Sequence, residues 1–236
     1  MDKKTVFFNS LRFSFRRSIP IMIGFFPVGL AYGILMQNAG YNALWSGLCS
    51  LFVFAGSLQM LMVTFFTDVL PLVTVVIMAA LLNSRHMFYG LSFIEKFRSY
   101  GPWRWFLIYG LTDENYSLLC AYQPTEGVDE KTVHILSTAL TWLYWIVFAA
   151  FGGIVGRLIP FDTTGIDFAL TGLFVVILID QLKGAANRWP AVVSAASGIV
   201  CILIFGAANF LLPSLLITVA ALLLLRGQFE RGEARA

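Results

Sequence analysis

Long apolar stretches separated by short polar segments dominate the chain from Ser18 onward. Most are close to the ~20 residues that an α-helix needs to cross about 30 Å of hydrocarbon. A transmembrane β-barrel would instead show alternating segments of about ten residues. The pattern therefore predicts an all-α, polytopic membrane protein. The apolar stretches cover residues 18–36, 44–66, 70–94, 105–120, 135–159, 166–182, 190–206 and 209–225.

The composition narrows the function classes. Of 236 residues, 58% are hydrophobic and 12% are charged, whereas a soluble domain carries about a quarter charged residues. Cys49, Cys120 and Cys201 are widely spaced within apolar stretches, which indicates neither a metal site nor a disulfide. The chain has no phosphate-binding G-x-x-x-x-G-K-[ST] loop, and its polar loops are too short for an enzyme domain. We predict a non-enzyme without cofactor, metal or nucleic-acid partner, and any transport driven by an ion gradient.

The charges and a weak internal repeat predict the topology. Residues 26–52 can be laid over 149–176 so that several glycines coincide. If every apolar stretch crossed, the basic segment 96–104 would lie outside and the acidic segment 124–131 inside, against the positive-inside rule. The rule is satisfied if 44–66 and 166–182 each enter and return on one side, with turns near 55–57 and 180–181. We predict two inverted repeats with about six crossings and two re-entrant broken helices; eight plain spans are the alternative.

This topology divides the chain into five parts. The first apolar stretch lacks a small-residue cleavage site, so we expect it to remain as a span. The predicted parts are a basic cytoplasmic N-terminus (1–17), a first membrane repeat (18–120), an external acidic loop (121–134), a second membrane repeat (135–225) and a cytoplasmic tail (226–236).

Two clusters of ionisable residues interrupt the apolar stretches, in "LLNSRHMFYG" (81–90) and "LTDENY" (111–116). Insertion scales assign a charge in hydrocarbon at least ~2.5–3.5 kcal/mol, so such residues indicate function. The clusters flank a loop centred near residue 100, and an antiparallel hairpin would therefore bring Arg85 and His86 opposite Glu114 and Asp113.

We predict a structural ion pair between Arg85 and Glu114, which makes burial of both charges tolerable. A simple ion pair needs one acidic and one basic residue. These clusters contain more ionisable groups than that, namely two carboxylates, one arginine and a histidine. Asp113, Glu114 and His86 are therefore the predicted proton-coupling residues, since histidine titrates near neutral pH. The alternative is that the pair only locks two helices together.

The segment "FVFAGSLQ" (52–59) indicates a second kind of chemistry. Gly56 allows a turn, and Ser57 is a favourable N-cap residue. The N-terminus of a half-helix within the membrane offers N–H groups and a partial positive charge to a carboxylate. The alternative is a small-residue patch for helix packing. The predicted substrate-binding residues are Gly56, Ser57, Gln59, Asn83 and Asn115.

Four motifs, in order, resemble the AzlC/YgaZ family, the large subunits of bacterial branched-chain amino acid exporters. They are "FPVGLAYGIL", "SLFVFAGSLQ", "LLNSRHMFYGLSF" and "LTDENYSLL". The resemblance is strong over residues 18–120. It implies location in the bacterial cytoplasmic (inner) membrane and export of hydrophobic amino acids such as valine, leucine, isoleucine and methionine. It also implies a small membrane partner of the AzlD/YgaH type.

The residues and the resemblance lead to the same prediction, a secondary transporter that works by proton antiport. An amino-acid zwitterion needs an anion-binding end and a cation-binding end in a largely apolar pocket. The N-terminus near Gly56 and Ser57 would bind the carboxylate, and Asp113 or Glu114 would bind the ammonium group or a proton. The alternatives are a passive channel and a membrane assembly subunit without transport of its own.

Overall fold

The structure, a computed structural model, describes most of the chain as α-helices, and all regular elements in the described part are helical. The all-α prediction is therefore confirmed for this part. The chain forms two compact units, residues 1–69 with 83–167 and residues 70–82 with 168–236. The described residues are 3–68, 70–123, 125–158, 175, 179, 189–206 and 210–233.

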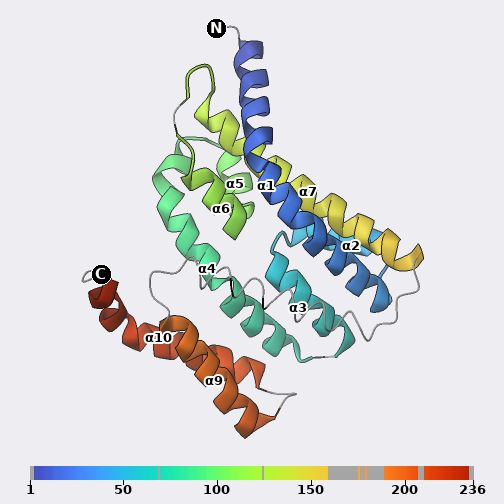
Figure 1. The fold of residues 1–236 in the computed structure, drawn as a ribbon, viewed down its shortest axis with the longest axis vertical. Coiled ribbons are helices and arrows are strands. Elements are labelled where there is room, and N and C mark those ends of the chain that lie inside the picture. The colour runs from blue at the N-terminus through green and yellow to red at the C-terminus, as the bar shows by residue number, and fades with distance from the viewer. Residues whose placement is uncertain are drawn as a thin grey trace. The chain divides into compact units, whose positions relative to one another are not determined.

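The first unit contains seven of the described helices in whole or part (Figure 1). They are α1 (Lys3–Asn38), α2 (Ala43–Phe52), α3 (Gly56–Thr67), α4 (Leu72–Arg98, from residue 83), α5 (Trp103–Tyr109), α6 (Asp113–Cys120) and α7 (Glu130–Leu158).

The second unit contains the start of α4 together with α9 (Trp189–Phe205) and α10 (Leu211–Glu233). The latter two pack against each other, and the Ser197 hydroxyl donates a hydrogen bond of 3.1 Å to the carbonyl of Ser214. The predicted second re-entrant segment, 166–182, lies outside the described residues apart from Val175 and Ile179.

In the first unit, α1 and α7 lie side by side and run in the same direction (Figure 1). Near the start of both helices, the Ser14 hydroxyl donates to the carbonyl of Val133 at 3.3 Å. Near the end of both, Gly33 lies directly against the backbone of Ala149 and Gly153. Because the start of α1 contacts the start of α7 and the end contacts the end, the two helices are parallel.

The parallel pair contradicts the prediction of inverted repeats. α1 opens the first proposed repeat and α7 opens the second, and inversion would make these two helices antiparallel. Four of the coinciding glycines have a different physical origin, because Gly29, Gly33, Gly152 and Gly156 are positions where α1 and α7 contact each other. Small residues let membrane helices approach closely, so each helix carries them on the shared face.

We expect Gly33→Ala to destabilise the protein by about 1–3 kcal/mol, because an added methyl group would collide with the α7 backbone. The matched control is Gly24→Ala on the same helix, where nothing lies within 4 Å of the added carbon. That change should be neutral or stabilising by up to about 1 kcal/mol. Thermal unfolding of the purified variants measures both, and equal melting temperatures would contradict the observed packing.

α2 and α3 form a helical hairpin that returns to the end of α1 where it began. The Tyr41 ring, just before α2, lies 4.9 Å from the Phe66 ring at the end of α3. Inside the hairpin, the Gln59 side-chain amide donates to the Ser50 hydroxyl at 3.0 Å. The predicted break near 55–57 and the return of the chain are confirmed.

α5 and α6 form a second hairpin, which starts at the opposite end of the first unit from the α2–α3 hairpin. The sequence predicts one apolar stretch over 105–120, but the helix ends at Tyr109 and a new one begins at Asp113. The two hairpin tips meet, because the Tyr109 hydroxyl donates to the carbonyl of Leu51 and the rings of Phe54 and Tyr109 are 6.3 Å apart.

α7 is the scaffold on which both tips dock. Its Thr138 hydroxyl accepts a hydrogen bond of 2.8 Å from Asn115 in α6, and its Trp145 indole donates to Gln59 in α3 at 2.6 Å. Among the described residues, α1 and α7 are long and apolar enough to cross a membrane, and α4 adds a third if its two bent parts count as one span. The total of six crossings stays a prediction.

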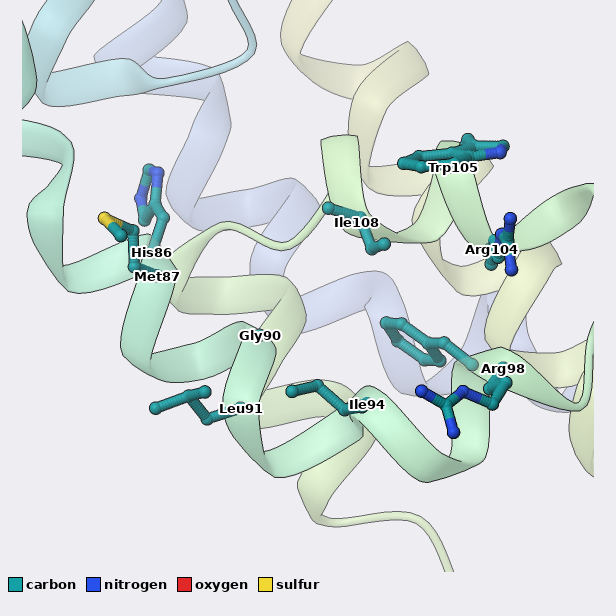
Figure 2. Close-up of a pocket in the computed structure, with 10 residues that line it drawn as sticks. His86, Met87, Gly90, Leu91, Ile94, Arg98, Arg104, Trp105 and Ile108 are labelled. Carbon is teal, nitrogen blue, oxygen red and sulfur yellow. The ribbon is translucent and has the colours of Figure 1, made fainter.

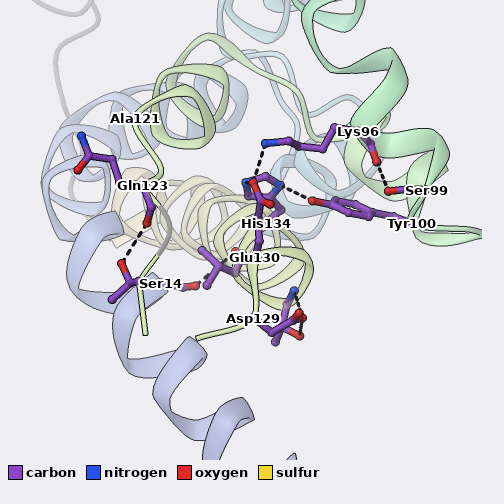
Figure 3. Close-up of polar contacts among 12 residues, drawn as sticks. Ser14, Lys96, Ser99, Tyr100, Ala121, Gln123, Asp129, Glu130 and His134 are labelled. Carbon is purple, nitrogen blue, oxygen red and sulfur yellow. Dashed lines mark hydrogen bonds and ion pairs between the residues drawn. The ribbon is translucent and has the colours of Figure 1, made fainter. Parts of the chain in front are cut away.

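The segment 121–131 packs against the N-terminal part of α1 and the end of α4 (Figure 3). Arg17 donates to the carbonyl of Ala121 at 2.8 Å, and the Lys96 ammonium lies 2.6 Å from a Glu130 carboxylate oxygen. Residues in direct contact cannot lie on opposite sides of about 30 Å of hydrocarbon. These contacts contradict the predicted separation of an external acidic loop from cytoplasmic basic segments.

Tyr100 completes this end of the unit, with its hydroxyl 3.2 Å from Nδ1 of the fully buried His134 (Figure 3). Burial, followed by the negative charges of Glu130 and Asp129, raises the pKa of the Tyr100 phenol. The hydroxyl therefore stays protonated and can donate to the imidazole.

We expect cysteines introduced as Ser99→Cys and Glu126→Cys in a cysteine-free variant to react with an impermeant maleimide from the same side of the membrane. Asn38→Cys, at the other end of α1, should react from the opposite side. Labelling of intact cells and inverted vesicles measures the sidedness. Reaction of positions 99 and 126 from opposite sides would contradict the packing of segment 121–131.

Candidate substrate site between two hairpin tips

A small polar cavity of about 30 Å³ lies where the two hairpin tips meet. α3 contributes its first turn, α6 contributes its first turn, and α4 supplies two side chains from the side. The cavity is lined by Ala55, Gly56, Ser57, Asn83, His86, Thr112, Asp113 and Glu114. The structure thus brings together six of the predicted site residues from three segments that are far apart in the sequence.

The N-terminus of α3 is the positive side of this cavity. A helix N-terminus carries roughly half a unit of positive charge. The N-cap residue of α3 is Ala55, which has no side chain able to cap the helix, and no acidic residue lies in the first turn. A carbon added at Gly56 would lie 3.3 Å from the Trp145 ring, so glycine lets the helix start directly against this indole.

The N-terminus of α6 is the negative side. Thr112 is its N-cap, and the side-chain oxygen accepts a hydrogen bond of 3.4 Å from the backbone N–H of Asn115. Asp113 and Glu114 occupy the first turn, where the helix dipole stabilises negative charge. The two carboxylates therefore have a local physical reason for their place in an apolar chain.

His86 connects α4 to this acidic turn. Its Nε2 lies 3.9 Å from Oδ1 of Asp113, and the two side chains are 25% and 33% exposed. The predicted approach of His86 to Asp113 is therefore confirmed. The side chain of Arg85 lies outside the described residues, so the predicted ion pair with Glu114 stays a prediction.

The structure does not bring Gln59 or Asn115 to the cavity, although both were predicted to bind substrate. Both side chains are fully buried in the protein. Gln59 joins α2, α3 and α7 through its bonds to Ser50 and Trp145. Asn115 donates to the carbonyl of Gly110 at 2.7 Å and to Thr138, which fixes the second tip on α7. Their contacts indicate structural roles.

Two cavity residues were missed by reasoning from the sequence, Ala55 and Thr112. Thr112 had a usable signal, because a threonine followed by acidic residues is a typical helix start. Gly110 before it is a typical helix stop, so the break within 105–120 could have been found. Ala55 carries no signal of its own, since only its backbone position matters here.

The arrangement suits a molecule with one negative and one positive group. An anion can approach the start of α3, while a cation or proton can associate with Asp113, Glu114 and His86. A buried apolar cluster packs around the first tip; its members are Phe25, Phe54, Tyr144 and Trp145. Charge of both signs close to apolar side chains suits a hydrophobic amino acid.

Comparison with known proteins gives a consistent family match. The family model described as AzlC protein matches residues 20–159. The branched-chain amino acid transport protein AzlC of Bacillus subtilis is 32% identical over 99% of this chain and 92% of its own length. A membrane protein of Helicobacter pylori is 35% identical over 95% of this chain and 98% of its own length.

The inner membrane protein YgaZ of Escherichia coli is 25% identical over 77% of this chain and 78% of its own length. No solved structure matches the chain.

Proposed function

Because the chain belongs to the AzlC family of membrane proteins, which includes amino acid transport proteins, we propose that it is a secondary transporter for branched-chain and other hydrophobic amino acids. We further propose that it exports them from the bacterial cytoplasm in exchange for protons. The observation that carries the proposal is the convergence of two helix starts of opposite charge character on one cavity.

The proposed binding mode follows from these charges. The substrate carboxylate lies at the start of α3, near Gly56 and Ser57, and the ammonium group lies at Asp113. A hydrogen bond between charged groups contributes about 1.5–3 kcal/mol, so each end of the zwitterion adds substantially to binding. When the amino acid leaves, a proton can take the place of the ammonium group on the Asp113–His86 pair. This exchange couples the two movements in opposite directions.

We propose that the described conformation is closed, because the cavity is small. A cavity of about 30 Å³ can hold one or two water molecules, whereas ligand pockets typically measure about 300–1,000 Å³. An amino acid therefore requires the two tips to move apart. We propose that separation of the α2–α3 and α5–α6 tips admits the substrate, with α7 as the fixed element.

The proposal includes a small membrane partner of the AzlD/YgaH type and an inner-membrane location with a cytoplasmic N-terminus. The partner and the inner membrane come from the family resemblance, whereas the cytoplasmic N-terminus comes from the distribution of basic residues. The membrane location agrees with relatives described as membrane proteins.

The test is efflux of labelled valine, leucine, isoleucine and methionine from proteoliposomes, with and without the partner and an imposed pH gradient. The proposal expects efflux against a substrate gradient that stops when the pH gradient is collapsed. Flux that ignores the pH gradient would instead identify a passive channel. No flux even with the partner present would identify an assembly subunit.

A further inference from the structure

An apolar groove between α4 and α5 lies outside the proposed transport site for most of its length (Figure 2). Its volume is about 480 Å³, and Leu91 and Ile94 on α4 face Trp105 and Ile108 on α5 across it. The full lining is His86, Met87, Gly90, Leu91, Ile94, Phe97, Arg98, Arg104, Trp105 and Ile108.

The two arginines lie together at one end of the groove, and His86 and Met87 lie at the other (Figure 2). Within the described part of the chain, no ion pair joins Arg98 or Arg104 to a carboxylate. The Arg104 guanidinium lies 4.8 Å from the Trp105 ring centre, a cation–π contact that holds it at the mouth of the groove. This end therefore presents two positive charges next to an apolar channel.

The position of the arginines matches a membrane interface. They belong to the end of the first unit that also carries Lys96, Lys131 and the first turns of α1. Tryptophans such as Trp103 and Trp105 favour the boundary between lipid headgroups and hydrocarbon. The groove walls are open, with Leu91 63% and Trp105 65% exposed, so a neighbouring molecule in the membrane can enter from the side.

We propose that this groove binds an anionic phospholipid, with its phosphate between Arg98 and Arg104 and one acyl chain along Leu91, Ile94 and Ile108. Charge complementarity decides the occupant: two guanidinium groups at the interface favour an anionic headgroup, and the aliphatic channel behind them fits a hydrocarbon chain. Basic pockets beside membrane helices bind anionic headgroups in this manner. The site does not depend on the proposed transport activity.

The test is binding of fluorescent phosphatidylglycerol and phosphatidylcholine to the purified full-length chain in a neutral detergent. Each arginine near a membrane surface strengthens the binding of an anionic lipid. The double variant Arg98→Gln with Arg104→Gln should therefore weaken phosphatidylglycerol binding roughly 30-fold. Phosphatidylcholine binding should change little. The variant Arg98→Lys with Arg104→Lys keeps both charges and should retain most of the preference, which separates charge loss from misfolding.

Two matched controls use exposed positions on α1. Arg12→Gln with Arg16→Gln removes the same charge from an exposed helix face and should leave phosphatidylglycerol binding within about threefold of the unmodified protein. Leu91→Trp fills the groove and should weaken binding of both lipids, whereas Ile23→Trp, at a position 65% exposed, should not.

An equal loss in the α1 arginine variant would overturn the proposal in favour of non-specific attraction. Unchanged binding in Leu91→Trp would also overturn it, because the acyl chain would then lie elsewhere. If another protein chain is the natural occupant of the groove, the unmodified protein should bind phosphatidylglycerol no better than phosphatidylcholine. That result would also overturn the proposal.

Discussion

Asp113→Asn is expected to lower pH-driven efflux of leucine by roughly ten- to a hundredfold. The substitution keeps the shape of the side chain but removes the negative charge at the start of α6, 3.9 Å from His86. Loss of one charge-assisted hydrogen bond to the ammonium group accounts for this range. Because asparagine cannot carry a proton, coupling is lost, whereas counterflow of leucine at saturating concentration should be partly retained.

The measurement is efflux and counterflow on the same proteoliposomes. Asp68→Asn is the matched control, since Asp68 is exposed at the far end of α3 and does not line the cavity. Glu114→Gln should have a smaller effect on coupling, because Glu114 is more exposed than Asp113. Normal pH-driven efflux in both site variants would show that neither acid carries the proton.

Asn115→Leu is expected to lower the free energy of unfolding by about 1–3 kcal/mol, or the melting temperature by roughly 3–10 °C. The change leaves the carbonyl of Gly110 and the hydroxyl of Thr138 without the donor they have in the native protein. Leucine affinity per folded molecule should stay within about twofold, because Asn115 does not line the cavity. This outcome would separate a structural role from the substrate-binding role predicted from the sequence.

Thr138→Val provides the control for this hydrogen bond. Combined with Asn115→Leu, it should cost less than the sum of the two single changes, because the Thr138 hydroxyl is then absent and only the Gly110 carbonyl is left without its donor. A coupling of about 0.6–1.7 kcal/mol is typical for hydrogen bonds between membrane helices. Strict additivity, or a large loss of leucine affinity with normal stability, would contradict the structural role of Asn115.

The first broken helix could be predicted because its signals are local. Gly56 and Ser57 interrupt an apolar stretch. In addition, a cytoplasmic position of the basic segment 96–104 requires the chain to return. The second break was missed because residues 105–120 are apolar enough to resemble one span, and hydropathy does not report where hydrogen bonds along a helix stop. Gly110 and Thr112 carried that information.

Relations between distant segments were harder to predict. The glycines of α1 and α7 resemble a repeat because they share a contact face, and sequence comparison cannot distinguish a repeated element from two complementary surfaces. The predicted separation of segment 121–131 from the basic segments failed because the charge rule treats each loop separately. Here Glu130 is paired with Lys96, so the acidic segment lies beside basic ones.

For the candidate site, the sequence indicated ionisable residues that the structure brings to one cavity, but not the complete geometry of that cavity. The cost of charges in hydrocarbon pointed to His86, Asp113 and Glu114, and all three line the cavity. The sequence could not show whether Gln59 and Asn115 bind substrate or have structural roles, because a buried amide looks the same in a sequence in both cases. Only the hydrogen-bond partners distinguish the two.

The most direct test of the central claim, that opposite helix starts bind the two ends of an amino acid, is binding of three ligands to the purified protein by calorimetry. Leucine carries both charged groups, 3-methylbutylamine lacks the carboxylate, and 4-methylpentanoate lacks the amine. Asp113→Asn should weaken binding of leucine and of 3-methylbutylamine by roughly ten- to a hundredfold and leave binding of 4-methylpentanoate within about twofold. Equal weakening of all three ligands, or of none, would contradict the claim.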